Sequence, residues 1–212
     1  MKFTPEYLKL YAITNRQWLK NKSLPHAVEE AIKGGATLIQ LREKNITYEE
    51  FKKLALDVKS VTDKYNIPLI INDNVELCKD IDADGVHVGA DDMSVKKARE
   101  ILGNNKIVGG TARTLERALQ AYAEGADYLG IGAVFNTTTK SGTTHMTKDL
   151  AKSINNTVNI PTVAIGGINH KNASQLSDYG VSGIAVVSAI FAQDNIISAC
   201  IKLREIVDKF KS

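Results

Sequence analysis

The sequence is poor in cysteine, and this excludes two kinds of scaffold. Its 212 residues contain only two cysteines, Cys78 and Cys200, which lie far apart in the chain. Two isolated cysteines cannot build a disulfide framework or a cysteine-based zinc site. Each lies in a helix-like, partly apolar segment, so we expect both to be buried free thiols, which often behave as small core residues.

Long hydrophobic runs and a strong charge bias are also missing. No apolar run approaches the roughly 20 residues that span a bilayer, and residues 1–6 lack the apolar core of a signal peptide. The net charge of +3 is small and spread along the chain, which gives no support to a nucleic-acid-binding surface. We therefore expect a cytoplasmic protein that binds neither membranes nor nucleic acids, in which any electropositive site is local.

What the sequence does contain is an alternation of short apolar runs and longer amphipathic segments. With 43% hydrophobic and 24% charged residues, the composition is that of a globular protein. Most of the apolar runs are rich in Ile, Val and Leu without polar alternation, which is typical of parallel strands covered on both faces. Eight strands are predicted, at residues 9–14, 37–41, 68–71, 85–88, 106–109, 128–131, 162–165 and 183–187.

Eight consecutive strand and helix units point to one architecture. No linker rich in Pro, Gly or Ser interrupts them, which favours a closed (β/α)8 TIM barrel over a doubly wound open sheet. We expect one catalytic domain over residues 1–212. In such a barrel the active site forms at the carboxyl ends of the strands, so the residues that follow each apolar run are the candidates for function.

The second predicted strand ends in an unusual way, at Gln40-Leu41-Arg42-Glu43-Lys44. Successive side chains of a strand point to opposite faces, so Gln40, Arg42 and Lys44 should share one face. Two cations and an amide suit an anionic ligand with several oxygens. The alternative is a solvated strand end followed by a basic loop.

Carboxylates follow the next two predicted strands. Asn72 and Asp73 follow the third strand, and Asp91 and Asp92 follow the fourth. Carboxylates from neighbouring strand ends could share Mg²⁺, a hard cation that prefers oxygen ligands. The alternative is that Asp73 and Asp92 only cap the helices that come next, since Asp is a common N-cap residue. The histidines show no metal-binding spacing, so a histidine-based zinc site is not expected.

Two further segments suit phosphate groups. Residues 132–145, after the sixth strand, are rich in hydroxyls around Lys140, and a loop of this length is either a binding lid or a flexible polar loop. Gly166 and Gly167 follow the seventh strand, and Ser188 opens the last helix after the eighth. Loops after these two strands often bind phosphate, although a tight turn and a helix cap would explain the same residues.

Together these segments resemble the thiamine phosphate synthase family over nearly the whole chain, from Tyr11-Ala12-Ile13-Thr14 to Ser188-Ala189-Ile190. The resemblance implies a transferase that joins a hydroxymethylpyrimidine diphosphate to a hydroxyethylthiazole phosphate and releases pyrophosphate. The motifs that carry it are Gln40-Leu41-Arg42-Glu43-Lys44, Ile71-Asn72-Asp73, Gly85-Val86-His87-Val88-Gly89-Ala90-Asp91-Asp92, Thr137-Thr138-Thr139-Lys140, Ile165-Gly166-Gly167-Ile168 and Val187-Ser188.

The resemblance also implies roles for individual residues. Asp73 and Asp92 would hold Mg²⁺ on the diphosphate, with Asp91 left open as a further ligand. Arg42, Lys44, Thr111 and Lys140 would be the catalytic residues that bind the departing pyrophosphate. The implied substrate-binding residues are these four together with Gln40, Asn72, Thr137, Thr139, Gly166, Gly167, Val187 and Ser188. The partners would be the two small substrates, and assembly into a homo-oligomer is left open.

The sequence departs from the family pattern at four positions. Ala90 stands where the family commonly has Gln, Thr111 where it has Ser, and Ala133 and Asn136 where it commonly has prolines. Thr111 keeps a hydroxyl, and no charged group is lost. Losing prolines should loosen the loop after the sixth strand. We expect these changes to alter turnover rather than the class of reaction.

Two other functions share parts of this pattern. Thiazole tautomerases have the same barrel and bind a thiazole phosphate without joining it to a pyrimidine. A non-catalytic barrel that senses a phosphorylated ligand would also need the phosphate-binding glycines. Asp73, Asp92 and the lysine-bearing loop favour the synthase, and Arg113 stands where the tautomerase segment tends to carry His.

Overall fold

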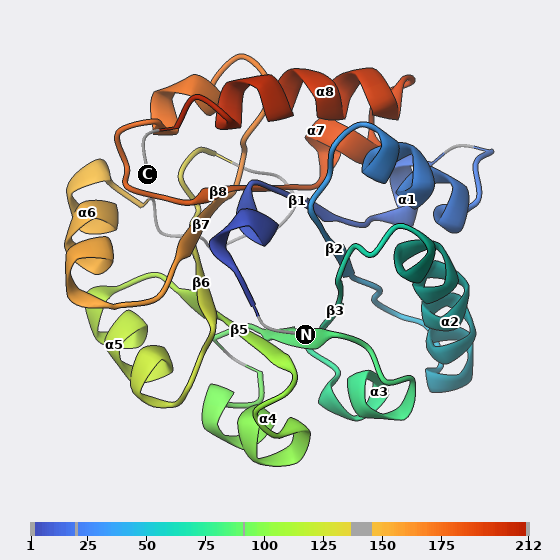
Figure 1. The fold of residues 1–212 in the computed structure, drawn as a ribbon, viewed down its shortest axis with the longest axis horizontal. Helices are drawn as coiled ribbons and strands as arrows, with labels where there is room; N and C mark the ends of the chain where they lie inside the picture. Colours follow the sequence, from blue (N-terminus) through green and yellow to red (C-terminus); the bar gives the residue numbers. More distant parts are fainter. Residues whose placement is uncertain (1–2, 20, 91, 137–145, 211–212) are drawn as a thin grey trace.

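The eight predicted strands form a closed parallel barrel, in which each strand pairs with the next one in the sequence and β8 pairs with β1 (Figure 1). The computed structural model describes residues 3–19, 21–90, 92–136 and 146–210. The predicted (β/α)8 barrel is thus confirmed. The strands are β1 (Leu10–Ile13), β2 (Leu38–Leu41), β3 (Leu69–Asn72), β4 (Gly85–Val88), β5 (Ile107–Ala112), β6 (Tyr128–Gly132), β7 (Thr162–Ile165) and β8 (Gly183–Val186).

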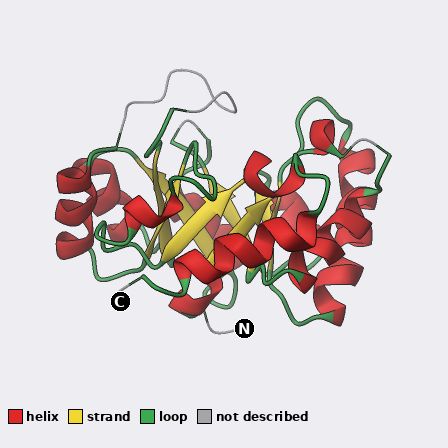
Figure 2. Ribbon diagram, turned by 90° about the horizontal axis from the view of Figure 1, so that it is seen from above, coloured by secondary structure: helices red, strands yellow, loops and turns green. Residues whose placement is uncertain are grey.

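Helices surround the barrel on its outside (Figures 1 and 2). Within the described residues, none of them is long and apolar enough to cross a membrane. The α-helices are α1 (Leu24–Lys33), α2 (Tyr48–Lys64), α3 (Val75–Asp80), α4 (Val95–Leu102), α5 (Leu115–Ala123), α6 (Lys148–Thr157), α7 (Ser188–Phe191) and α8 (Ile196–Val207). The 3₁₀ helices are η1 (Pro5–Leu8), η2 (Arg16–Trp18) and η3 (Ala173–Leu176).

Two helices differ from the sequence prediction. Between β7 and β8 the chain forms only the short η3, because the side chains of Asn169 and Asn172 accept hydrogen bonds from nearby backbone N–H groups and so compete with a helix. Ser188 was expected to open the last helix, and this is wrong. It opens the four-residue α7, and the last helix, α8, has its own N-cap in Asn195.

The two faces of the strands pack into two separate cores. The outward faces pack against the helices, where Cys78 of α3 and Cys200 of α8 are buried free thiols, as predicted. Burial raises the pKa of both thiols to about 12. The inward faces form a second cluster, and Phe3 and Tyr7 pack against it beside η1. In Figure 1, η1 lies across the centre of the ring of strands, so this end of the barrel is closed by apolar side chains.

Strand β5 runs three residues past its predicted end at Gly109, as far as Ala112. Gly109 looks like a turn residue in the sequence, but it lies opposite Tyr128 of β6, and a Cβ at this position would overlap the Tyr128 ring. The glycine is therefore required by packing inside the barrel. As a consequence Thr111 belongs to a strand, and alternation gives its side chain the same face as Gly109.

Replacement of Gly109 by alanine should destabilise the protein, because the buried Tyr128 ring has to move. We expect Gly109→Ala to lower the free energy of unfolding by about 1–3 kcal/mol in denaturant titrations. Gly110→Ala is the matched control on the opposite face of β5, where the added Cβ would lie 3.1 Å from a movable Val95 methyl group. Equal losses in the two variants would contradict this account of Gly109.

Candidate active site

A cavity of about 590 Å³ opens at the carboxyl ends of the strands. Every second side chain of a strand points to the inside of the barrel, and the last of these inward side chains line the cavity. Leu38 belongs to the apolar cluster inside the barrel, and Gln40, two residues further along β2, lines the cavity. Ile70 and Asn72 repeat this step in β3. Each strand therefore passes from the apolar interior to a polar wall at its carboxyl end.

The structure brings together all the predicted site residues that lie within its described part. These residues line the one cavity: Gln40, Arg42, Lys44, Asn72, Asp73, Asp92, Thr111, Gly166, Gly167, Val187 and Ser188. Asp91, Thr137, Thr139 and Lys140 lie outside the described residues, so their places in the site stay predictions.

The end of β2 is ordered by contacts on both of its faces. Gln40, Arg42 and Lys44 line the cavity, whereas Glu43 turns away and binds Arg16 of η2, with 2.8 Å between Arg16 Nη2 and Glu43 Oε2. The Arg42 N–H donates to the Thr14 hydroxyl at 3.0 Å. Gln40 is 3% exposed, and the Glu43 side chain is 6% exposed. The strand end is therefore only partly solvated, because Gln40 and Glu43 are enclosed whereas the Lys44 side chain is 54% exposed.

Asp73 and Asp92 do not cap the helices that follow them, so the capping alternative is wrong. Asn74 caps α3 and Ser94 caps α4, each by accepting a hydrogen bond from the N–H of the third helical residue. Asp73 has a φ of 62°, a left-handed conformation that few residues other than Gly, Asn and Asp adopt. Asp92 accepts a hydrogen bond from the Gly89 N–H at 3.0 Å. Both carboxylates are thus free to line the cavity.

The two carboxylates interact with each other and with Lys44. Asp73 Oδ2 lies 2.8 Å from Lys44 Nζ. Burial raises the pKa of Asp73, but hydrogen bonds from Lys44 and Asp92 outweigh burial, and the pKa lies below its usual value. The pKa of Asp92 is raised, by burial first and then by the hydrogen bond and the charge of Asp73. The two carboxyl groups therefore titrate as a coupled pair, in which Asp73 loses its proton more readily than Asp92.

A divalent cation fits the same pair, because its two positive charges would balance the two carboxylates. The described residues contain no cluster of three or more His, Cys, Asp and Glu side chains that could hold a metal. The remaining coordination positions would therefore belong to water and to substrate oxygens. This is the usual situation of Mg²⁺ beside a diphosphate.

A chain of hydrogen bonds crosses the barrel beneath the cavity and links residues from five strands. Gln40 Nε2 donates to Tyr11 Oη at 2.6 Å, and Tyr11 Oη lies 2.8 Å from Tyr128 Oη. Tyr128 Oη lies 3.1 Å from His87 Nδ1, and His87 Nε2 lies 3.0 Å from Thr111 Oγ1. The sequence prediction missed Tyr11 and Tyr128 as site residues, because a tyrosine in an apolar strand is ordinarily a core residue.

The glycines after β7 meet a structural demand as well as lining the cavity. Gly166 and Gly167 have φ values of 103° and 66°, and a Cβ at Gly166 would lie 2.5 Å from the Cβ of Ala133. The left-handed backbone and the close approach of Ala133 therefore require glycine here, and this does not remove the glycines from the cavity wall. Val187, not Ser188, occupies the N-cap position of α7, so Ser188 does not cap that helix.

A closed barrel that gathers cations, carboxylates and amides at the carboxyl ends of its strands has the architecture of a (β/α)8-barrel enzyme with an anionic substrate. Comparison with known families is more specific. The family model described as thiamine monophosphate synthase matches residues 10–190. The chain belongs to the thiamine monophosphate synthase family.

Individual relatives agree with this assignment. A thiamine-phosphate synthase from Clostridium tetani is 47% identical over 92% of this chain and 93% of that protein. A thiamine-phosphate synthase from Caldanaerobacter subterraneus is 49% identical over 95% of both proteins. A solved structure, the thiamine phosphate pyrophosphorylase from Pyrococcus furiosus, is 38% identical, with a TM-score of 0.89 over 98% of this chain and 99% of that one.

Family membership confirms the resemblance seen in the sequence, and with it a transferase that makes thiamine phosphate. Its substrates are small molecules. The roles of single residues, the metal and the state of assembly are a separate matter, because membership of a family does not place a ligand in this cavity. These roles have to be argued from the geometry.

Proposed function

We propose that the cavity holds a hydroxymethylpyrimidine diphosphate beside a hydroxyethylthiazole phosphate. The bond between the pyrimidine methylene carbon and the diphosphate oxygen breaks, and its electron pair leaves with pyrophosphate. The thiazole nitrogen then donates its lone pair to the methylene cation, which the pyrimidine ring stabilises, and a carbon–nitrogen bond forms. The enzyme needs no covalent nucleophile, so its work is to stabilise the leaving group and to align the two rings.

The observation that carries this proposal is the meeting of Lys44, Asp73 and Asp92 on one side of the cavity. In a ring of eight strands, β3 and β4 lie opposite β7 and β8. The diphosphate is assigned to the charged side, and the thiazole phosphate to the side formed by Gly166, Gly167, Val187 and Ser188. A cavity of about 590 Å³ is in the range that holds small ligands.

The charged side would bind the pyrophosphate as negative charge develops on it. Arg42 offers a planar fork of N–H donors, and Lys44 offers a mobile ammonium group. Thr111 adds a hydroxyl, and Lys140 would add a second ammonium group from the loop after β6. Gln40 and Asn72 would orient the pyrimidine and the diphosphate. These groups act most strongly on the leaving group, because its charge is greatest after the bond has broken.

Asp73 and Asp92 would hold Mg²⁺ against the diphosphate oxygens. When bound, the metal would supply positive charge that favours departure of pyrophosphate. The chain's own part is to keep both carboxylates directed into the cavity. The backbone conformation of Asp73 and the hydrogen bond from Gly89 to Asp92 support this arrangement.

The chain would act as one catalytic domain in the cytoplasm. All eight strands contribute to one barrel and border one cavity, so no second unit is needed to complete the site. Assembly into a homo-oligomer is compatible with this proposal and is not required by it.

Purified protein should form thiamine phosphate and pyrophosphate when both phosphorylated heterocycles and Mg²⁺ are supplied. Product formation is followed by chromatography and by release of pyrophosphate, with omission of each substrate and chelation of the metal as controls. Absence of product under the complete conditions would refute the proposal. Isomerisation of a carboxylated thiazole phosphate without the pyrimidine would instead favour a tautomerase.

Asp92→Asn should weaken the metal site, because the amide keeps the shape of the side chain but loses its charge. We expect the Mg²⁺ concentration at half-maximal rate to rise at least about tenfold. Asp178→Asn is the matched control, since Asp178 is exposed and pairs with Lys148 outside the cavity. An unchanged Mg²⁺ dependence in Asp92→Asn would remove Asp92 from the metal site.

Lys140→Ala should lower kcat by at least about a hundredfold while thermal stability changes little, because Lys140 is proposed to act on charge that develops during the reaction. Lys148→Ala is the control: this lysine follows in α6 and forms only an exposed ion pair with Asp178. Unfolding is measured by calorimetry and turnover by pyrophosphate release. Normal turnover in Lys140→Ala would exclude Lys140 from the reaction.

A further inference from the structure

We infer that Tyr128 and His87 are positioning residues for the pyrimidine diphosphate. Tyr128 and His87 belong to a chain of hydrogen bonds that runs from Gln40 to Thr111 and in which every donor points the same way. This chain determines which atom Gln40 and which atom Thr111 present to the cavity. The inference rests on the proposed function and goes beyond it, because it concerns selection between pyrimidines rather than the reaction itself.

The direction of the chain is set at its first step. Gln40 Nε2 donates to Tyr11 Oη, so the hydrogen of Tyr11 is available for another acceptor. Tyr11 is 1% exposed, and Tyr128 Oη lies 2.8 Å from its hydroxyl. Tyr128 is fully buried in turn and can give its own hydrogen to His87 Nδ1. Burial raises the pKa of Tyr11 and Tyr128, so both hydroxyls keep their hydrogens.

The hydrogen bond from Tyr128 also determines which ring nitrogen of His87 carries a hydrogen. A ring nitrogen that accepts a hydrogen bond carries no hydrogen, so the neutral ring of His87 holds its hydrogen on Nε2. His87 Nε2 then donates to Thr111 Oγ1 at 3.0 Å. Thr111 lines the cavity and keeps its own hydrogen for a ligand there. In the opposite direction Tyr128 would donate to Tyr11 Oη, which already accepts from Gln40, and the buried Tyr11 hydrogen would lose the acceptor that Tyr128 Oη now provides.

The two ends of the chain therefore present complementary atoms. Gln40 lines the cavity, and with Nε2 engaged by Tyr11 it presents the carbonyl oxygen Oε1, an acceptor for an amino group. Thr111 presents a hydroxyl hydrogen, a donor for a diphosphate oxygen. A 4-aminopyrimidine diphosphate matches both ends. Its 4-oxo analogue would place an acceptor against the acceptor of Gln40.

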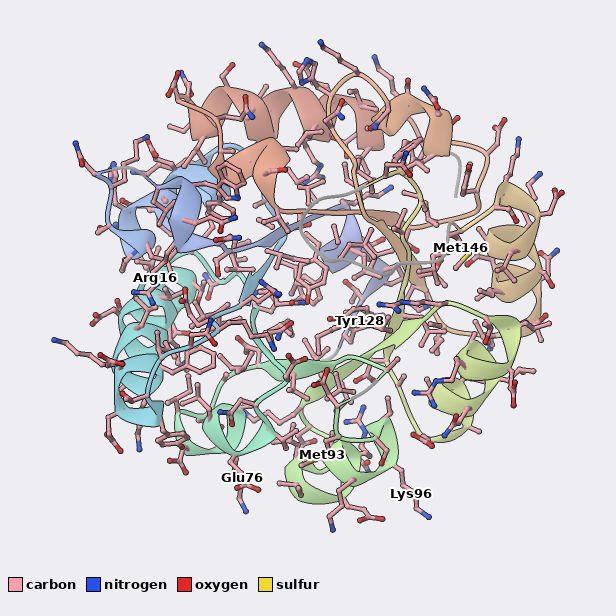
Figure 3. All side chains as sticks on the ribbon, turned by 180° about the vertical axis from the view of Figure 1, so that it is seen from behind. Arg16, Glu76, Met93, Lys96, Tyr128 and Met146 are labelled. Atoms are coloured by element: carbon pink, nitrogen blue, oxygen red, sulfur yellow. The ribbon has the colours of Figure 1, made fainter. Side chains whose placement is uncertain are left out.

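The barrel is built to hold the two aromatic rings that connect these ends. A Cβ at Gly109 would overlap the Tyr128 ring, and a Cβ at Gly130 would lie 3.3 Å from His87 Cε1, so glycines on β5 and β6 make the space. The Phe3 ring stacks on Tyr128 with 5.4 Å between centroids. Figure 3 shows Tyr128 near the middle of the barrel, away from the outer helices.

Tyr128→Phe tests the inference, because it removes one hydroxyl and keeps the ring. Without that acceptor, Tyr11 can donate to Gln40 Oε1, and the amide can turn its N–H₂ group to the cavity. We expect the ratio of kcat/KM for the 4-amino over the 4-oxo pyrimidine diphosphate to fall about tenfold, with KM for thiazole phosphate unchanged. A ratio measured on one preparation does not depend on the fraction that is folded.

Tyr65→Phe is the matched control, because it also loses a hydroxyl hydrogen bond, to Glu29 on the outside of the barrel at 2.6 Å. His87→Leu breaks the chain one step further on and should lower the ratio in the same way. An unchanged ratio in Tyr128→Phe, or the same fall in Tyr65→Phe, would overturn the inference.

The hydrogen on the His87 ring gives a readout that does not need turnover. Nitrogen NMR of the wild-type protein should show Nε2 protonated and Nδ1 unprotonated in the neutral ring. The reverse assignment would overturn the inference even if thiamine phosphate is made. If the wild type makes no thiamine phosphate, the proposed function fails, and the NMR assignment still decides the direction of the chain.

Discussion

Closure of the barrel is the constraint on which the rest of the structure depends. Once eight parallel strands form a ring, alternate residues of every strand must point inward. A substitution at any of these positions therefore changes the packing inside the barrel. Leu38, Ile70 and Ile107 fill the interior with apolar side chains, and the residues two or four positions later, Gln40, Asn72 and Thr111, face the cavity. Each of these strands therefore supplies both side chains of the core and side chains that line the cavity.

The same constraint brings unlike charges into contact. Lys44 and Asp73 come from neighbouring strand ends, and their ion pair offsets part of the cost of placing Asp73 in a partly enclosed site. Asp92 lies beside them, and its pKa is raised by burial first, and then by the hydrogen bond and the charge of Asp73. One side of the cavity thus places a cation and two carboxylates close together.

Much of the fold and of the site could be predicted from the sequence. The features that could not be predicted share one cause. The strands and the shared face of Gln40, Arg42 and Lys44 follow from a local period of two, which needs no knowledge of distant residues. The end of β5 was missed because the reason for Gly109 is the Tyr128 ring in the next strand. The capping alternative for Asp73 and Asp92 placed the helix caps one or two residues too early, since Asn74 and Ser94 cap as well as aspartate does.

The hydrogen-bond chain was missed for the same reason on a larger scale. Tyr11 and Tyr128 are 117 residues apart in the chain, and each one alone is an ordinary residue of an apolar strand. Only the closed ring shows that their hydroxyls meet. A local pattern can predict which face a side chain lies on, but not which side chain it will find there.

The apolar floor beneath the cavity has a consequence for the movement of ligands. Phe3 and the residues of η1 pack against the interior at the amino-terminal end of the barrel, so within the described residues the cavity opens at the carboxyl ends of the strands. Two ligands held at different depths in such a pocket would have to enter in order, the deeper one first, and leave in the reverse order.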